Sequence, residues 1–440
     1  MPNYIDPLKP SHRYPIFKVQ TCSGQPLEVT TASGQSTFIE PATTAGDSFG
    51  RLRIAEPFTL FDSSHRYRDN GLWNTSTGTG GTYAFNADQG LVDLNVTTAS
   101  GAKVIRETKR VFPYQPGQSL PVMHTFVMDS GVANRRQRVG YFSSGNGFYI
   151  EVSGTGEPYI VKRSSVSGSV TDTRVAQSEW NIDKLNGSGD SGFTLDPTKA
   201  QLSWFDFEWL GVGTVRAGFV MDGKFILCHS FHHANEIDST YMTTATLPCR
   251  YEIENLDTTT VSGQLKQSCS TVLSEGGYEL RGQGRSVAHS VDSPYDLTAT
   301  GTEYPVASIR LKSAKLDSVS ILAGISLLGI TNNANYKWKL VEGAKTSGDH
   351  WFSTSTDSSV QYKIDATGID STNAINIIQG YAIGSNQGST PITLSKDALF
   401  KYQLERNSFD STTTELTLCV STDTAGAEVL AAIDWEEITS

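Results

Sequence analysis

The Asp222-Gly223 dipeptide, placed between two apolar segments, is the sequence feature that most constrains the fold of this chain. Both residues of a two-residue hairpin turn need a positive φ, and Asp followed by Gly accepts this conformation at low cost. Residues 204–220, which precede the turn, are rich in the aromatic and β-branched side chains that strands favour. The stretch from 201 to 253 therefore predicts successive antiparallel strands in the core of a sheet.

Turn residues recur along most of the chain, which has 440 residues and 40 Gly. Alternating runs such as residues 91–96 and 147–152 are separated by Gly, Asn and Ser, and Asn146-Gly147 predicts a second hairpin turn. Strands at a spacing of about 8–12 residues are typical of a sandwich or jelly roll. Long helical patterns of apolar residues are scarce. We therefore expect an all-β fold.

Three regions are expected along the chain. Residues 1–45 hold six of the 16 Pro, which favours an extended N-terminal arm over a helix or a central strand. Residues 46–300 carry the alternating pattern of a large jelly-roll sandwich. A loose, polar stretch at 258–284 precedes a second alternating block, so a smaller C-terminal β-sandwich is expected at 301–440.

The arm is either a disordered tail or a segment that becomes ordered against a neighbouring subunit. Its aromatic side chains give it groups to dock, which favours the second interpretation. After the arm, two Arg at alternate positions form either a solvated strand face or a contact to a partner's carboxylate. The candidate assembly contacts are Tyr4, Tyr14, Phe17, Arg51 and Arg53.

Composition excludes several classes of function. The net charge of −11 argues against binding nucleic acid, which needs clustered Lys and Arg. The dense basic cluster Arg135-Arg136-x-Arg138 is local, and is either a solvated face or a contact to an acidic neighbour. The most apolar segment, residues 321–330, is too short to cross a membrane. Five Cys without a CxxC motif indicate reduced thiols, and the absence of a secretory signal after Met1 predicts synthesis in a cytoplasm.

Asp206 and Glu208 lie two residues apart on one expected strand, so both should point to the same face of the sheet. Jelly-roll glycoside hydrolases display carboxylates in this way, but with an ExDxxE-like spacing. Here Trp204 and Trp209 occupy the two positions that the other carboxylates would need, so a two-carboxylate mechanism has no support. The candidate contact residues for a glycan or a protein partner are Trp204, Asp206, Glu208 and Trp209, although large aromatics in sandwiches more often belong to the core.

Three His, at 229, 232 and 233, suggest a metal site by number alone. They lack the helical HExxH context and any flanking Cys pair, so hydrogen-bonded loop histidines are the better interpretation. No GxSxG, Walker or complete Rossmann motif is present. We therefore expect no metal, no cofactor and no enzymatic activity.

Several strings, in a consistent order over roughly residues 46–255, resemble structural proteins of tailed bacteriophages. Each string is moderately specific, and the ordered set is more specific than any one of them. They include Phe49-Gly50-Arg51-Leu52-Arg53, Trp180-Asn181-x-Asp183, Trp209-Leu210-Gly211-Val212-Gly213, Tyr241-Met242-Thr243-Thr244 and Leu247-Pro248-x-Arg250-Tyr251-Glu252.

This resemblance implies a concanavalin-like jelly-roll component of a virion, made in the host bacterial cytoplasm. Its expected place is the tail, baseplate or neck, with head decoration as an alternative. Its expected partners are other virion proteins and further copies of itself. A second alternative is a module that attaches the particle to a host surface glycan. The resemblance does not extend to the C-terminal block.

Overall fold

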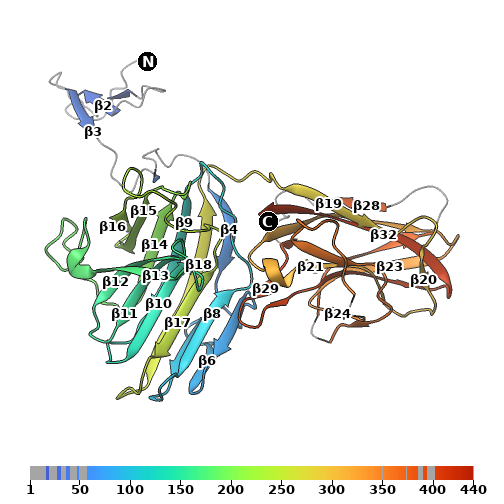
Figure 1. Ribbon diagram of the computed structural model, residues 1–440, viewed down its shortest axis with the longest axis horizontal. Helices are drawn as coiled ribbons and strands as arrows, with labels where there is room; N and C mark the ends of the chain where they lie inside the picture. The colour runs from blue at the N-terminus through green and yellow to red at the C-terminus, as the bar shows by residue number, and fades with distance from the viewer. Residues whose placement is uncertain are drawn as a thin grey trace, which may run out of the picture.

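The computed structural model describes residues 47–48, 57–348, 350–372, 374–384 and 402–439, together with the backbone of four further short strands. Two β-sandwiches follow one another along the chain (Figure 1). The expectation of an all-β protein with a large sandwich and a smaller C-terminal one is confirmed. The described residues include two short 3-10 turns, η1 (Gln177–Glu179) and η2 (Ser313–Lys315), and none of their helices is long and apolar enough to cross a membrane.

The large sandwich packs a seven-stranded sheet against an eight-stranded sheet. The first sheet has the order β13 (Thr171–Ala176), β12 (Pro158–Ser164), β11 (Gly147–Ser153), β10 (Arg135–Phe142), β17 (Cys249–Asn255), β8 (Lys103–Thr108) and β5 (Trp73–Thr77). The second has the order β16 (Lys224–Phe231), β15 (Val215–Met221), β14 (Gln201–Phe207), β9 (Leu120–Val127), β18 (Gly263–Ser274), β7 (Leu91–Val96) and β6 (Gly81–Asn86), with β4 (Phe58–Ser63) also paired to β18.

Alternation of side chains along each strand builds the core between these sheets. Tyr141 and Phe148 of the first sheet are fully buried against Phe205 and Phe207 of the second. Phe148 lies 5.5 Å from Phe207 between ring centroids. The residues between these positions face away from the core, and on the seven-stranded sheet they are largely charged.

The hairpin expected at Asp222-Gly223 joins β15 to β16, with Met221 opposite Lys224. Both turn residues have positive φ, 50° and 72°. The turn expected at Asn146-Gly147 joins β10 to β11, but its position differs. Gly147 already pairs with Phe142, and the loop closes through the Ser143 amide, which donates to the Asn146 carbonyl at 2.8 Å.

The polar stretch at 258–284 contains β18, a twelve-residue strand in the interior of the eight-stranded sheet. Its inward positions include Gln267 and Ser270, which are buried and hydrogen-bonded. Arg106 Nε donates to Gln267 Oε1 at 2.6 Å, and Ser270 Oγ lies 3.0 Å from His124 Nδ1. The sandwich core therefore contains a polar layer, which a pattern of apolar residues does not reveal.

The C-terminal sandwich consists of two five-stranded sheets. One has the order β19 (Gln283–Ala288), β32 (Ala427–Thr439), β22 (Val319–Gly329) and β28 (Thr390–Thr393), with β20 (Tyr295–Leu297) also on β32. The other has the order β25 (Val360–Lys363), β21 (Tyr304–Leu311), β31 (Leu416–Thr422), β23 (Asn335–Glu342) and β27 (Ile375–Ile383). β19 and β20 precede the expected boundary at residue 301, so this sandwich begins earlier than the sequence pattern indicates.

Two short ribbons complete the described strands, β24 (Lys345–Thr346) with β26 (Ile369–Asp370), and β29 (Arg406–Asn407) with β30 (Thr412–Thr413). The β29 ribbon lies at the junction of the two sandwiches (Figure 1). There Arg406 N donates to the Lys109 carbonyl at 3.0 Å, and Gln403 Nε2 donates to the Val111 carbonyl at 2.8 Å. Val111 packs in a small buried cluster with Val319 and Ile321, so apolar and polar contacts both join the sandwiches.

Within the region expected as an arm, the described backbone forms a three-stranded antiparallel sheet of β1 (Ile16–Lys18), β2 (Leu27–Thr30) and β3 (Ser36–Ile39). Four of the candidate assembly contacts, Tyr4, Tyr14, Arg51 and Arg53, lie outside the described residues, as does the side chain of Phe17.

Candidate functional site

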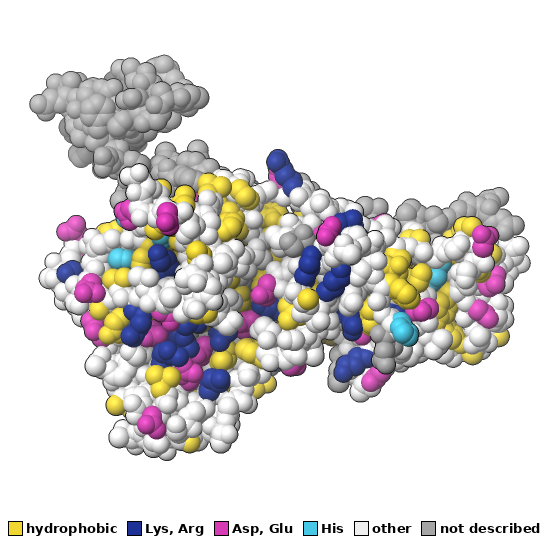
Figure 2. Space-filling view, in the orientation of Figure 1, with side chains coloured by type: hydrophobic (Ala, Val, Ile, Leu, Met, Phe, Trp, Pro, Cys, Tyr) yellow, Lys and Arg dark blue, Asp and Glu magenta, His cyan; other side chains and the backbone are white. Residues whose placement is uncertain are grey.

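Charged side chains gather on the outer face of the seven-stranded sheet, where Figure 2 shows blue and magenta atoms together on the large sandwich. We call this set the charged face. It arises because alternate residues of β10, β11, β12, β13, β17 and β8 point away from the apolar core. The set holds five arginines and five carboxylates, and its members are Glu107, Arg136, Arg138, Glu151, Arg163, Asp172, Arg174, Arg250, Glu252 and Glu254.

Strand register places opposite charges directly across from one another. Arg138 is the register partner of Glu252, and their side chains form an ion pair. Arg250 is opposite Glu107, and the two are 2.9 Å apart. Directly opposed charges of opposite sign stabilise a sheet.

The edge of the charged face repeats this arrangement. Arg163 holds its register partner Asp172 through two nitrogens, each 2.8 Å from a carboxylate oxygen. Arg136 pairs with Glu254 across the strands, and Arg174 pairs with Glu151. Every member of the charged face therefore has a partner of opposite charge.

Aromatic rings lie beneath these guanidinium groups. Arg163 stands 5.3 Å from the ring centroid of Tyr149, and Arg250 stands 5.3 Å from that of Phe142. Both rings are fully buried. The side chains of Arg138 and Glu252 are only 5% and 2% exposed, whereas that of Arg174 at the edge is 41% exposed. Arginine suits such a site because its planar group stacks on rings and forks onto carboxylates at the same time.

At Glu252 and Asp172 the surrounding arginines favour the ionised carboxylate. Burial raises the pKa of the Glu252 carboxyl, but the charges of Arg138 and Arg250 outweigh it and hold the pKa below its ordinary value. The pKa of Asp172 is also lowered, because its bonds to Arg163 outweigh its burial. A glycosidic proton donor needs the opposite, a raised pKa. These carboxylates can accept hydrogen bonds and hold arginines.

The candidate contact residues of β14 lie elsewhere, on the eight-stranded sheet. Trp204 is 2% exposed, its Nε1 donates to the Phe219 carbonyl at 3.3 Å, and its ring meets Phe225 edge-on. Asp206 is fully buried and paired with Arg216. A glycan or partner contact requires exposed side chains, and these two are buried.

The last two candidate contact residues follow the strand. β14 ends at Phe207, so Glu208 does not share a strand face with Asp206, and it is fully buried. Trp209 is half-buried and meets Tyr114 edge-on at 6.2 Å. A ring packed in this way against the core leaves little of its surface for stacking on a sugar.

The three histidines contact different partners instead of converging. The Asn181 amide donates to His229 Nδ1 at 3.3 Å. His233 is stacked on Tyr241, with Nδ1 2.7 Å from the Gly213 carbonyl and Nε2 2.9 Å from Lys162 Nζ. His232 is exposed. In the part of the chain that the structure describes, no group of three or more His, Cys, Asp or Glu is arranged to hold a metal ion.

Sequence reasoning singled out one strand of the charged face as a basic cluster, and named Arg250 and Glu252 only within the resemblance. The cluster at 135–138 contacts an acidic neighbour, which was one of its two interpretations: Arg135 also lies 3.0 Å from Asp129. Glu107, Glu151, Arg163 and Asp172 were missed. The available signal was a charge between two apolar residues, as at Glu151 between Ile150 and Val152. Which charges meet depends on strand register, which this signal does not contain.

No protein-family model and no curated protein sequence matches the chain. Solved structures do resemble it in fold. The Emp47p carbohydrate recognition domain is 10% identical, with a TM-score of 0.31, and the match covers 49% of this chain and 96% of that one. A Bacillus licheniformis β-glucanase is 12% identical, with a TM-score of 0.32. The match covers 48% of this chain and 96% of the glucanase chain. A glycosyl hydrolase family protein from Mycobacterium fortuitum is 9% identical, with a TM-score of 0.33. The match covers 49% of this chain and 99% of that protein. The likeness is one of concanavalin-like, jelly-roll architecture.

Proposed function

We propose that this chain is a non-enzymatic structural protein of a tailed-bacteriophage virion. The observation that carries the proposal is the role of the residues that resemble such proteins: they build the framework of the large sandwich. Trp180 is 1% exposed and stacks on Phe219. Asp183 accepts hydrogen bonds from the Leu185 amide at 2.8 Å and the Ser191 amide at 2.9 Å. A resemblance that rests on framework residues points to a shared architecture and away from a shared reaction.

The charged face supports the same proposal. Two further residues of the resemblance, Arg250 and Glu252, belong to it. All its charges are paired within the chain, so the groups contribute rigidity, and the lowered pKa of Glu252 makes that carboxyl a poor proton donor. A sandwich stiffened in this way suits a protein whose task is to hold neighbouring subunits in place.

Its proposed place is the tail, baseplate or neck, with head decoration as the alternative, after synthesis in the host bacterial cytoplasm. Its proposed partners are other virion proteins and further copies of itself, held through the region of residues 1–45 and through sheet surfaces. Symmetric homo-oligomers are the commonest assemblies of this kind. A host-attachment role through Trp204 and Trp209 has less support, because one ring is buried and the other half-buried.

The test is the mass in solution, measured by light scattering, of the full chain and of a chain lacking residues 1–45. We expect a multimer that falls to a monomer on truncation. A full-length variant carrying Tyr4→Ser, Tyr14→Ser and Phe17→Ser separates docking by these side chains from the presence of the segment, and we expect it to dissociate as well. Monomers in all three samples would contradict self-assembly through this region.

A further inference from the structure

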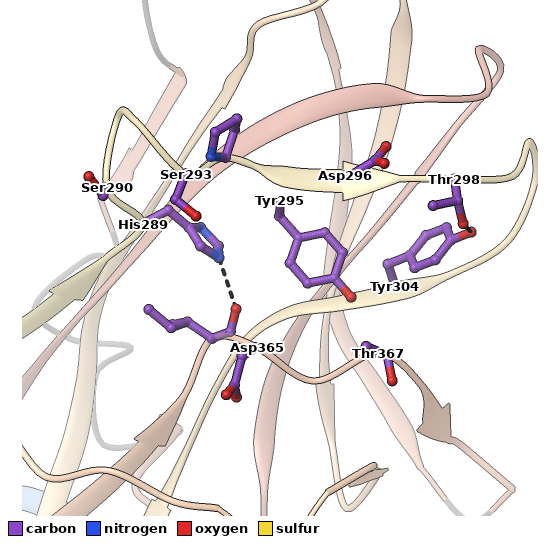
Figure 3. Close-up of a pocket in the computed structure, with 11 residues that line it drawn as sticks. His289, Ser290, Ser293, Tyr295, Asp296, Thr298, Tyr304, Asp365 and Thr367 are labelled. Atoms are coloured by element: carbon purple, nitrogen blue, oxygen red, sulfur yellow. Dashed lines mark hydrogen bonds between the residues drawn. The ribbon is translucent and has the colours of Figure 1, made fainter.

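A pocket of about 610 Å³ opens in the C-terminal sandwich, away from the charged face. Three segments surround it, as Figure 3 shows: the connection from β19 to β20, the start of β21, and the chain that follows β25. β19 and β20 belong to one sheet and β25 to the other, so the pocket lies where the two sheets part. Its volume falls within the range of roughly 300–1,000 Å³ that small-molecule sites occupy.

Rings form the wall of the pocket. Tyr295 stands between His289 and Tyr304, with ring centroids 6.0 Å and 6.1 Å away and both contacts edge-on. The Tyr295 hydroxyl donates to the Ala366 carbonyl. The Tyr304 hydroxyl lies 2.8 Å from Thr298 Oγ1 and accepts from the Ala299 amide at 2.9 Å. The wall is therefore fixed before any ligand arrives.

His289 is held as firmly as the tyrosines. Its Nδ1 accepts from the Ala431 amide at 3.1 Å, and its Nε2 lies 3.2 Å from the Ile364 carbonyl. Both ring nitrogens are thus engaged by the backbone, and burial lowers the pKa of the ring. His289 contributes a neutral ring face and has no nitrogen left for proton transfer.

Hydroxyls and two carboxylates form the rim. Asp296 and Asp365 are both exposed and stand on separate segments, and the Asp296 side chain leaves β20 on the opposite side from the Tyr295 ring (Figure 3). Four hydroxyl side chains, Ser290, Ser293, Thr298 and Thr367, complete the polar part of the lining. Among the described residues that line the pocket there is no Lys or Arg. The pocket thus combines an aromatic wall with hydrogen-bonding groups and a negative rim.

We propose that this pocket binds a neutral sugar unit of a glycan. A pyranose ring has an apolar face that packs on an aromatic ring such as Tyr295, and its hydroxyls are donors for carboxylates. None of the described lining residues is cationic, which disfavours phosphorylated, sialylated or uronic sugars, because their negative charge would approach the exposed carboxylates of Asp296 and Asp365. His289 supplies a ring face and no general acid or base, because the backbone engages both its nitrogens, and the proposal is one of binding. This inference is independent of the place of the protein in a virion.

The experiment is a glycan array probed with the full-length chain. The array carries neutral hexose and N-acetylhexosamine oligosaccharides beside sialylated and uronic-acid oligosaccharides, and titration calorimetry follows with each neutral oligosaccharide that binds. Asp365→Asn and Asp296→Asn remove one charged acceptor each without touching the wall. We expect each to weaken binding about tenfold, the effect of losing one hydrogen bond to a charged group. Asp190→Asn, an exposed carboxylate of the large sandwich, is the matched control and should leave the Kd unchanged.

A second variant tests the wall. Tyr295→Leu removes the ring and should abolish binding, whereas Tyr295→Phe keeps the ring and should retain most of it. Thermal melts of each variant show whether the sandwich stays folded, and the two Asp variants decide the matter if Tyr295→Leu does not fold. Absence of binding to every neutral oligosaccharide on the array would overturn the proposal. So would preference for the acidic ones, or a Kd that neither Asp variant changes.

Discussion

Arg406 Nη1 lies 2.8 Å from Glu107 Oε1, and this ion pair joins the two sandwiches with both side chains 2% exposed. The same nitrogen donates to the Thr108 carbonyl at 2.9 Å, and Nη2 reaches Asp317 at 3.0 Å. Arg406 therefore links β8 of the large sandwich to a loop of the C-terminal one. Since Arg250 also reaches Glu107, the junction continues into the charged face.

Replacing Arg406 by Met should destabilise the protein by about 3–5 kcal/mol, because removing one partner leaves the buried Glu107 carboxylate undercompensated. The measurement is the free energy of unfolding in urea. Arg281→Met is the control: Arg281 and Glu279 form an exposed pair, with side chains 75% and 61% exposed, which should contribute less than about 1 kcal/mol. Equal losses of unfolding free energy in the two variants would show that the buried pair at the junction stabilises the protein no more than an exposed pair does.

Glu252→Gln should cost about 3 kcal/mol at neutral pH, because Glu252 is the buried partner of both Arg138 and Arg250. Glu254→Gln, nearer the edge, should cost less. The pKa of Glu252 is lowered in the folded state, so the stability that its charge contributes is present above its unfolded pKa and is lost as pH falls through its folded pKa. The difference between wild type and Glu252→Gln should therefore shrink in acid. A gap that stays constant from neutral pH into the acid range would count against the ion-pair interpretation.

Buried histidines should make the protein sensitive to mild acid. Burial lowers the pKa of His124 from 6.5 to about 3, and lowers those of His65, His229 and His233 to about 4. Between these values and 6.5 the unfolded chain binds protons that the folded chain does not, so the free energy of unfolding falls as pH falls from about 6.5 to about 4. His124→Gln should reduce that slope by up to about 1.4 kcal/mol per pH unit. A slope that His124→Gln leaves unchanged would refute the assignment.

The β15–β16 turn offers a test of backbone strain alone. Gly223 has a φ of 72° with no atom near the position of an added Cβ, and Gly284 in β19 has the same open space without a positive φ. Gly223→Val should therefore destabilise by about 1–2 kcal/mol, and Gly284→Val by much less. Thermal melting of the two variants measures the difference. Comparable melting temperatures would mean that the turn does not need its left-handed conformation.

Local signals in the sequence predicted the fold class and some of the turns. The Asp222-Gly223 hairpin could be placed to the residue because its turn type depends on two adjacent residues. β18 could not be found from its polar composition, because Gln267 and Ser270 face a polar layer of the core whose other members, Arg106 and His124, lie far away in the chain. The second sandwich was expected to begin at 301 because β19 pairs with β32, which lies far away in the chain.

The sites depended still more on distant contacts. Arg138 suggested an acidic neighbour, but its pairing with Glu252 needs the register of β10 against β17, more than a hundred residues apart. Trp204 was a candidate contact for a sugar, with a place in the core as its alternative, and the sequence does not show that Phe225 and the Phe219 carbonyl would enclose it. The pocket around Tyr295 joins segments at 289–304 and 364–367, which carry no shared motif.

The pairing of β32 has a consequence for how the chain matures. This strand lies between β19 and β22, and Gln283 is opposite Glu437. The strands of the large sandwich end at Ser274, so on a ribosome that sandwich can close long before β32 emerges. β19 and β20 must then wait unpaired while more than a hundred further residues are made, and exposed strand edges invite pairing with other chains. During synthesis from the N-terminus, the large sandwich can therefore fold early and the C-terminal sandwich only late. If the ribosome stalls before residue 427, proteases should cleave the C-terminal sandwich while the large sandwich resists them.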